Sequence, residues 1–179
     1  MKLTYAAVKV FACALLLFAG LGASLPRPNF SGTWALEHAR SFSVPRDSQQ
    51  TMVVSHEGDR VSVETKIVSP QGERVVKDSY ALDGKEAEFT PQQVPAESRV
   101  GTGKRTGRWL PSDNGFVVEE EFQTKTPEGK TVENRLTRKW IMWADGSLSI
   151  DLYTDNPRGS FETKRVFVKS GGATGGGKP

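Results

Sequence analysis

Few residues in this 179-residue chain have the types and spacing that catalysis needs. Glu119, Glu120 and Glu121 place acids on both faces of an expected strand, and paired carboxylates can exchange protons with a substrate. They have no matching histidine or aspartate nearby, so Glu120 is only the best of weak candidates. His38 and His56 are the two histidines, whereas a metal ion usually takes three or four converging ligands. We therefore expect no catalytic residue, no metal site and no cofactor.

Two arginines are better candidates, for binding. Arg138 lies on a long expected strand with Trp140 and Met142, where it is either an interior base or a solvated residue beside Lys139. Arg165 lies on the last expected strand, and an arginine inside the protein needs a partner because an unpaired buried charge is costly. That partner could be a side chain, water, or the carboxylate of a ligand.

The face on which Arg165 lies depends on the preceding turn at residues 156–159. An even loop there puts Arg165, Phe167 and Phe161 on one face with Leu148, Ile150 and Leu152 of the neighbouring strand. A one-residue bulge would instead pair Asp151 with Arg165, because a slip by one residue exchanges the faces of a strand. We adopt the first register, which makes Arg165, Phe167, Leu148, Ile150, Leu152 and Arg138 the candidate ligand-binding residues.

A basic cluster directly precedes one tryptophan. Lys104, Arg105 and Arg108 lie next to Trp109, a pattern seen both in nucleic-acid sites and in edge strands protected by charge. The low net charge of the mature chain favours the edge-strand interpretation over a nucleic-acid site. Residues 1–24 contain Lys2 and Lys9 and no acid, so removing them lowers the formal net charge from +3 to +1. A binding surface for nucleic acid is not expected.

Residues 1–24 read as a signal peptide. Two lysines precede an apolar run at residues 11–21, and small residues follow at 22–24. The apolar run is shorter than the ~20 residues of a membrane span, although an uncleaved anchor is the alternative. We expect export to the periplasm or the extracellular space, with no stable membrane anchor after cleavage. Cys13, the one cysteine, leaves with this segment, so the mature chain has no disulfide.

The mature chain is long enough for one domain with its own core. We expect an extended lead-in at residues 25–28, a single domain at 29–169 and a disordered glycine-rich tail at 170–179. Short segments of strand type alternate with turn signals, and no long helical period is present. We expect strands at residues 33–37, 51–56, 60–68, 73–82, 86–90, 105–110, 116–125, 130–143, 147–154 and 160–169.

The turns indicate how these strands connect. A proline–glycine turn occurs at residues 69–72, 126–129 and 156–159, and the pairs at 83–84 and 145–146 suit tight hairpins. Hairpins join sequential neighbours, so the fold class is all-β, an antiparallel up-and-down meander of about 8–10 strands. Closure into a barrel removes the exposed edges of such a sheet. A β-sandwich is the alternative, but its crossing connections need more long loops than the two present, at residues 38–50 and 91–104.

Two stretches resemble the calycin group, which includes lipocalins and fatty-acid-binding proteins. Residues 30–36 are similar to the first strand of the fatty-acid-binding proteins, and residues 145–151 with 163–167 to their last two strands. The closing tyrosine of that family is replaced by Phe167, which removes a hydroxyl. Residues 38–50 are too short for the family's two-helix lid.

The resemblance implies roles for three residues. Gly32 would let the chain approach closely, and Trp34 would plug one barrel end against a basic residue of the last strand; both roles are structural. Arg165 resembles that basic residue, and it also aligns with the arginine that holds carboxylates in fatty-acid carriers. Both roles for Arg165 stay open here.

The expected function is non-catalytic binding of a small apolar or amphipathic ligand, including a carboxylate. A ligand-sized void of ~300–1,000 Å³ would cost at least ~7 kcal/mol if dry, at about 24 cal/mol per Å³. The cavity must therefore be partly polar or filled by ligand. The first alternative is a cell-envelope interaction module with a filled barrel, and the second is a lipocalin-like enzyme. The sequence leaves the oligomeric state unknown.

Overall fold

The computed structural model describes residues 26–92 and 94–170, which form one antiparallel β-structure with two short 3₁₀ helices. The predicted signal peptide and nearly all of the predicted tail lie outside these residues. No helix in the described part is long and apolar enough to cross a membrane. The elements are β1 (Gly32–Leu36), η1 (His38–Arg40), β2 (Gln49–Glu57), β3 (Arg60–Ser69), β4 (Gly72–Ala81), β5 (Asp83–Phe89), η2 (Ala96–Ser98), β6 (Arg99–Trp109), β7 (Gly115–Lys125), β8 (Thr131–Met142), β9 (Leu148–Asn156) and β10 (Gly159–Lys169).

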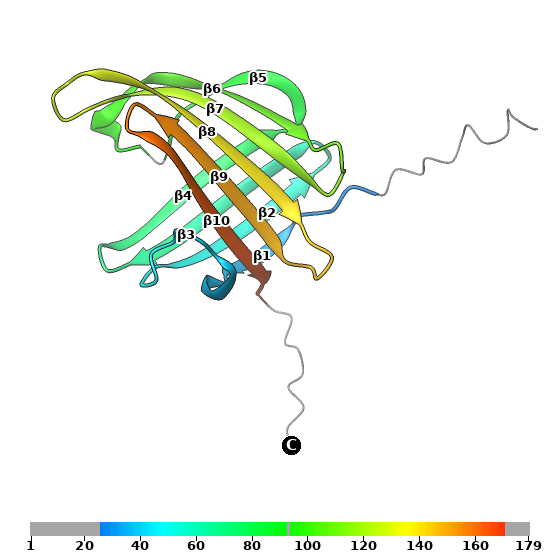
Figure 1. Cartoon of the computed structure of the whole chain (residues 1–179). Helices are drawn as coiled ribbons and strands as arrows, with labels where there is room; N and C mark the ends of the chain where they lie inside the picture. The colour runs from blue at the N-terminus through cyan, green and yellow to red at the C-terminus, as the bar shows by residue number, and fades with distance from the viewer. Residues whose placement is uncertain (1–25, 93, 171–179) are drawn as a thin grey trace, which may run out of the picture.

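The ten strands form a single sheet that curls into a nearly closed barrel (Figure 1). The strand order is β4-β3-β2-β1-β10-β9-β8-β7-β6-β5, so the first and last strands meet in the middle of the wall. Trp34 of β1 lies opposite Lys169 of β10, and the Ser170 N–H donates to the Thr33 carbonyl oxygen at 2.8 Å. The predicted all-β meander barrel is confirmed, and the sandwich alternative is not adopted.

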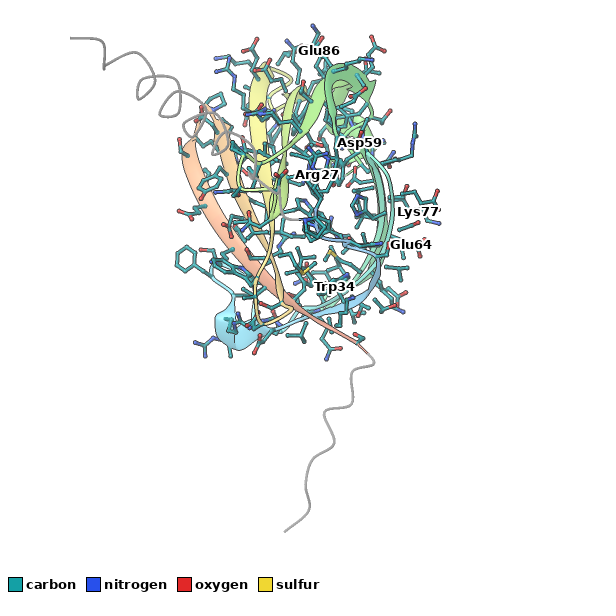
Figure 2. All side chains as sticks on the ribbon, turned by 90° about the vertical axis from the view of Figure 1, so that its right-hand side faces the viewer. Arg27, Trp34, Asp59, Glu64, Lys77 and Glu86 are labelled. Carbon is teal, nitrogen blue, oxygen red and sulfur yellow. The ribbon has the colours of Figure 1, made fainter. Side chains whose placement is uncertain are left out.

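Side chains alternate between the inside and the outside of the wall, as the two-residue period of a strand requires. In β2 the residues Gln50, Met52 and Val54 are buried and their neighbours are exposed. Figure 2 shows Trp34 inside, whereas Glu64 and Lys77 project from the outer surface, where they form an ion pair of 2.9 Å. Most large apolar side chains therefore line the barrel, whereas the outer face combines ion pairs with exposed apolar residues such as Val53 and Tyr153.

Aromatic packing closes one end of the barrel. Phe30 and Phe116 meet edge to face with ring centroids 5.0 Å apart, and Phe116 stacks on Trp140 at 5.2 Å. Trp34 is fully buried, and its Nε1 donates to the Phe30 carbonyl oxygen at 2.9 Å. We call this the closed end. The opposite end, with the β3–β4, β7–β8 and β9–β10 turns, is the hairpin end.

The barrel wall is interrupted between β4 and β5. The pair at residues 83–84 was expected to form a tight hairpin joining these strands, and this prediction is wrong: β5 pairs with β6, and β4 pairs with β3. The chain leaves β4 at Leu82, whose N–H binds the Asp59 carbonyl oxygen at 2.7 Å. Gly84, at φ 74°, then turns the chain onto β6, with a register irregularity between Asp83 and Glu86.

The two expected long connections are shorter than predicted. β6 begins at Arg99 instead of residue 105, because the left-handed Gly101 (φ 64°) lets a bulge continue the strand between Val100 and Lys104. Residues 38–50 hold the three-residue helix η1, and β2 already begins at Gln49. Neither connection covers the hairpin end with a pair of helices.

Candidate functional site

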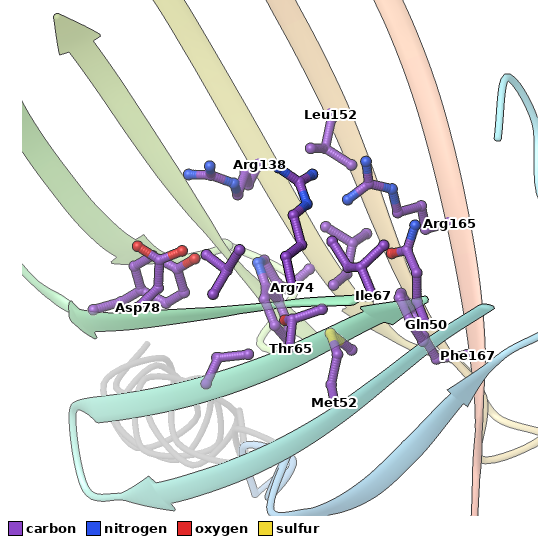
Figure 3. Close-up of a pocket in the computed structure, with 15 residues that line it drawn as sticks. Gln50, Met52, Thr65, Ile67, Arg74, Asp78, Arg138, Leu152, Arg165 and Phe167 are labelled. Carbon is purple, nitrogen blue, oxygen red and sulfur yellow. The ribbon is translucent and has the colours of Figure 1, made fainter. Parts of the chain in front are cut away.

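A cavity of about 170 Å³ lies inside the barrel (Figure 3). The barrel is therefore filled at its closed end and hollow above it. The cavity is smaller than the ~300–1,000 Å³ of typical ligand pockets. It is lined by Gln50, Met52, Val63, Thr65, Ile67, Arg74, Val76, Asp78, Tyr80, Arg138, Trp140, Ile150, Leu152, Arg165 and Phe167.

The lining changes from apolar to polar along the barrel axis. Three pairs of lining residues, each two positions apart on one strand and so on one face, show the change. Toward the hairpin end, Met52 is followed by Gln50 in β2, Trp140 by Arg138 in β8, and Phe167 by Arg165 in β10. The cavity therefore has an apolar floor against the closed end and a layer of arginines above it.

A buried ion network holds Arg138 in this layer. Glu120 of β7, only 2% exposed, accepts hydrogen bonds from Arg138 Nη1 and from Arg105 Nε of β6, the latter at 2.6 Å. Arg105 Nη2 also donates to Asp78 Oδ1 of β4 at 2.9 Å. Both carboxylates are thus held by arginines, and one end of the Arg138 guanidinium is fixed.

Arg105 also bridges the interrupted part of the wall. Its Nη1 donates to the Ser79 carbonyl oxygen of β4 at 3.0 Å, and its guanidinium lies over the rings of Phe89 and Tyr80 at 4.2 and 4.8 Å. A side chain of β6 therefore joins β4 where a backbone ladder is missing. Burial raises the pKa of the Tyr80 hydroxyl, which stays protonated at neutral pH.

Arg165 lies in the same layer without an acidic partner in the described part of the chain. Its Nε is buried and makes no hydrogen bond to those residues. Burial, together with the positive charges of Arg138 and Arg74, lowers the pKa of Arg165 to about 10. The side chain is still a cation at neutral pH, so the site carries an uncompensated positive charge.

Other polar atoms of the lining are also unpaired within residues 26–92 and 94–170. Arg138 Nη2, Trp140 Nε1 and Gln50 Oε1 are buried and have no hydrogen-bond partner there. Buried donors and acceptors are nearly always satisfied in folded proteins. Arg74 of β4 adds a third guanidinium at the cavity, between those of Arg138 and Arg165 in the view of Figure 3. The layer is thus rich in donors that can receive an anion.

The structure brings together five of the six predicted ligand-binding residues. Arg165, Phe167, Ile150, Leu152 and Arg138 line the cavity. The sixth, Leu148, is fully buried in the core at the closed end. The predicted register is present, with Arg165 opposite Ile150 and Phe167 opposite Leu148. That these residues bind a ligand stays a prediction.

Two roles expected of basic residues are corrected by the geometry. The cation over the Trp34 ring is Lys169, with Nζ 5.3 Å from the ring centroid, so Arg165 does not form the expected clasp. Gly32 lies beside the same pair, where a Cβ would be 3.5 Å from Lys169 Cε. Arg138 is only 4% exposed, which excludes the solvated position beside Lys139.

The basic cluster around Trp109 does not form a single surface. Lys104 and Arg108 point outward and pair with Glu86 and Glu119, whereas Arg105 points into the barrel. The edge-strand interpretation is also wrong, because β6 lies between β5 and β7. Two-residue alternation along the strand separates neighbours in sequence onto opposite faces of the wall.

Sequence reasoning missed Gln50, Arg74, Asp78 and Arg105. A signal was present for two of them: Arg74, Asp78 and Tyr80 are separated by even numbers, so an inward Tyr80 places the other two on the inner face. Arg105 was grouped with Lys104 and Arg108 in a basic cluster, and its own position on the strand was not considered.

Comparison with known proteins identifies the fold. No protein-family model matches the chain, and a search of curated proteins finds no significant match. A SAHS (abundant heat soluble) protein from Ramazzottius varieornatus is 14% identical, with a TM-score of 0.50 over 79% of this chain and 95% of that one. A zebrafish ileal bile acid-binding protein, solved with cholic acid, is 14% identical, with a TM-score of 0.48 over 79% and 98%. The chain has the calycin-type barrel fold.

Proposed function

We propose that this protein binds a small amphipathic acid in the barrel cavity and does not transform it. The observation that carries the proposal is Arg165, an inward-facing cation with no acidic partner in the described residues, next to an apolar floor. An unpaired charge in such a place is costly. A bound anion would offset this cost, and its apolar part would fill the space beneath.

The order of the lining gives the ligand an orientation. The apolar part would contact Met52, Trp140 and Phe167 toward the closed end. The acid group would lie one layer higher, against Arg165 and Arg138. Because the cavity is about 170 Å³, the apolar part that fits inside is short.

Binding is favoured over catalysis by the state of the two interior acids. Glu120 and Asp78 are both held by arginines, and Glu120 is almost inaccessible. A general acid or base must reach the reacting group and exchange a proton with it. Carboxylates tied into such a network are better suited to holding arginines in place.

We also propose that the protein acts outside the cytoplasm. The support is the signal-like pattern of residues 1–24, with Lys2 and Lys9 before the apolar run. Cell fractionation with mass determination of the purified chain tests this. Recovery of an uncleaved chain in the cytosol would contradict it.

Native mass spectrometry of the protein purified from its own cells tests the binding function. We expect an extra mass that disappears after extraction with organic solvent, and its identification gives the ligand. A clean mass without bound molecule, together with no binding of short fatty acids in solution, would contradict the proposal.

A matched pair of variants ties the result to the site. Arg165→Gln should lose most of the affinity for the acid and keep the affinity for its neutral alcohol analogue. Arg60→Gln is the control, because Arg60 is exposed and lies at the start of β3, near the closed end. Equal loss of acid and alcohol binding would indicate that Arg165 is structural.

A further inference from the structure

The charge at the cavity exceeds what a single carboxylate neutralises. The lining and its ion network contain four arginines, Arg74, Arg105, Arg138 and Arg165, against two carboxylates, Asp78 and Glu120. Both carboxylates are already engaged with arginines. The excess is therefore two positive charges, carried by the partly buried Arg165 and by Arg74, which lines the cavity but is exposed to solvent.

Free donors reach the arginine layer from three different strands. Arg74 comes from β4, Arg138 from β8 and Arg165 from β10, and Figure 3 shows the three guanidinium groups at one level. Glu120 holds Arg138 through Nη1, while Nη2 stays unpaired within the described residues. Arg165 Nε is unpaired in the same sense. The donors thus come from three different strands that line the same cavity.

This arrangement fits a group with several acceptor oxygens. A planar carboxylate presents two oxygens and one charge to its neighbours. A phosphate monoester presents three terminal oxygens and about −1.5 to −2 charges at neutral pH. Arginine forms paired, charge-assisted hydrogen bonds with such groups. Three guanidinium groups with two excess positive charges match the phosphate monoester better than the carboxylate.

We infer that the acid group of the ligand is a compact dianionic oxyanion of the phosphate monoester type. This inference rests on the proposed binding function and names the class of ligand for that same cavity. The short apolar floor accepts a small hydrocarbon part, and the three arginines bind the head group above it. The same chemistry is offered by an alkyl phosphate and by free phosphate.

The test compares head groups that share one tail. Purified full-length protein is titrated calorimetrically with hexyl phosphate, hexyl sulfate, heptanoate and inorganic phosphate at about pH 7.5, where the phosphate monoester is mostly a dianion because its second pKa is about 6. Hexyl sulfate has the same tetrahedral shape with one charge. We expect hexyl phosphate to bind about tenfold or more tightly than hexyl sulfate or heptanoate.

Titration with inorganic phosphate distinguishes an alkyl phosphate ligand from free phosphate. Weak binding of inorganic phosphate beside tight binding of hexyl phosphate supports a phosphate ester that uses the floor. Equally tight binding of both supports the same head group as a free oxyanion.

The pH dependence gives a second readout. Lowering the pH to about 5 protonates the monoester, so its advantage over hexyl sulfate should disappear. The diester methyl hexyl phosphate has one charge throughout and controls for titration of the groups that face the ligand. These groups are the cavity-lining Arg74, Asp78, Tyr80, Arg138 and Arg165, together with Arg105 and Glu120 of the ion network that holds them.

Arg74→Gln removes one of the two excess charges without touching the buried network. We expect it to reduce the preference for hexyl phosphate over hexyl sulfate several-fold, while Arg60→Gln leaves the preference unchanged. Equal affinities for hexyl phosphate, hexyl sulfate and heptanoate would overturn the head-group inference and leave the proposed function intact. No binding of any of the four probes would overturn both.

Discussion

At the scale of single residues, the interior arginines differ in what they contribute to stability. Arg105 and Arg138 share Glu120, whereas Arg165 has no acidic partner in the described residues. Removing one partner of a buried ion pair destabilises the fold, because the other charge is left unpaired. A charge inside the protein that has no partner destabilises the fold already. Breaking the Glu120 network should therefore lower the free energy of unfolding, whereas removing the charge of Arg165 should raise it.

Arg165→Met should stabilise the ligand-free protein. The methionine keeps much of the side-chain volume and removes an unpaired cation, so we expect a gain of roughly 1 kcal/mol in the free energy of unfolding. Denaturant unfolding with ligand removed measures it. A loss of stability would show that Arg165 has a structural partner in the fold.

Glu120→Gln should be strongly destabilising. It leaves the guanidinium groups of Arg105 and Arg138 without their shared carboxylate, a change that typically costs about 3–5 kcal/mol. Glu119→Gln is the control on the outer face, where loss of the exposed pair with Arg108 should cost at most about 1 kcal/mol. Similar effects of the two variants in denaturant unfolding would contradict a buried network.

Asp151→Asn should stabilise the protein in a pH-dependent way. Burial raises the pKa of Asp151 above its usual value, and its Oδ1 has no hydrogen-bond partner in the described chain. The folded state therefore holds the proton more tightly than the unfolded state, and stability is lost as the pH rises above about 4. The gain from asparagine should be present at neutral pH and absent near pH 3 in unfolding curves. A gain independent of pH would contradict this origin.

The facing of Arg165 could be predicted from sequence, and its surroundings could not. An even number of loop residues at 156–159 places Arg165 and Phe167 on the inner face, and this register is observed. The residue that packs on Trp34 is set by where β10 ends against β1, a contact between distant parts of the chain. Neighbours in sequence misled the interpretation of Arg105, because only strand position decides which side chain is buried.

At the scale of elements, the strands were predictable and the break between β4 and β5 was not. Two-residue alternation and proline–glycine turns indicate all ten strands, because both are local signals. Asp83-Gly84 also has the composition of a tight hairpin, yet this point of the chain moves from one sheet edge to the other. Where a barrel wall fails to close depends on all strands together.

Gly107→Ala should weaken the interrupted part of the wall. A Cβ at Gly107 would lie 2.2 Å from the Ala81 carbonyl oxygen, so β6 and the end of β4 would be forced apart. We expect a loss of about 1–3 kcal/mol in stability, as for other overpacked sites. Thr106→Ala on the same strand is the control, with little effect expected. Equal unfolding midpoints for Gly107→Ala and the unmodified protein would show that β6 and the end of β4 can accommodate a methyl group without strain.

At the scale of the whole molecule, the barrel is divided into an aromatic half and a hollow half. Trp34, Phe30 and Phe116 fill the closed end and supply the packing that a chain without disulfides needs. The hollow half contains the polar layer and the cavity. The aromatic core and the proposed binding cavity thus lie in different halves of the barrel.

Ligand binding should stabilise the molecule as a whole. A ligand that binds only the folded barrel adds about 2.7 kcal/mol to the free energy of unfolding when present at 100 times its Kd. Thermal unfolding with increasing hexyl phosphate measures this as a rising midpoint. Arg165→Met should remove most of the rise, and a rise of equal size in that variant would place the ligand elsewhere.

The neighbouring positions of β1 and β10 have a consequence for how the chain folds. Both ends of the barrel domain lie at the closed end, and the β1–β10 ladder joins strands from opposite ends of the sequence. A circular permutant that links Ser170 to Asn29 and opens the chain between Leu82 and Asp83 would run through the sheet in strict spatial order. Every ladder would then be a hairpin between successive strands. Since local contacts speed folding, this rearranged chain should fold faster than the natural one while building the same cavity.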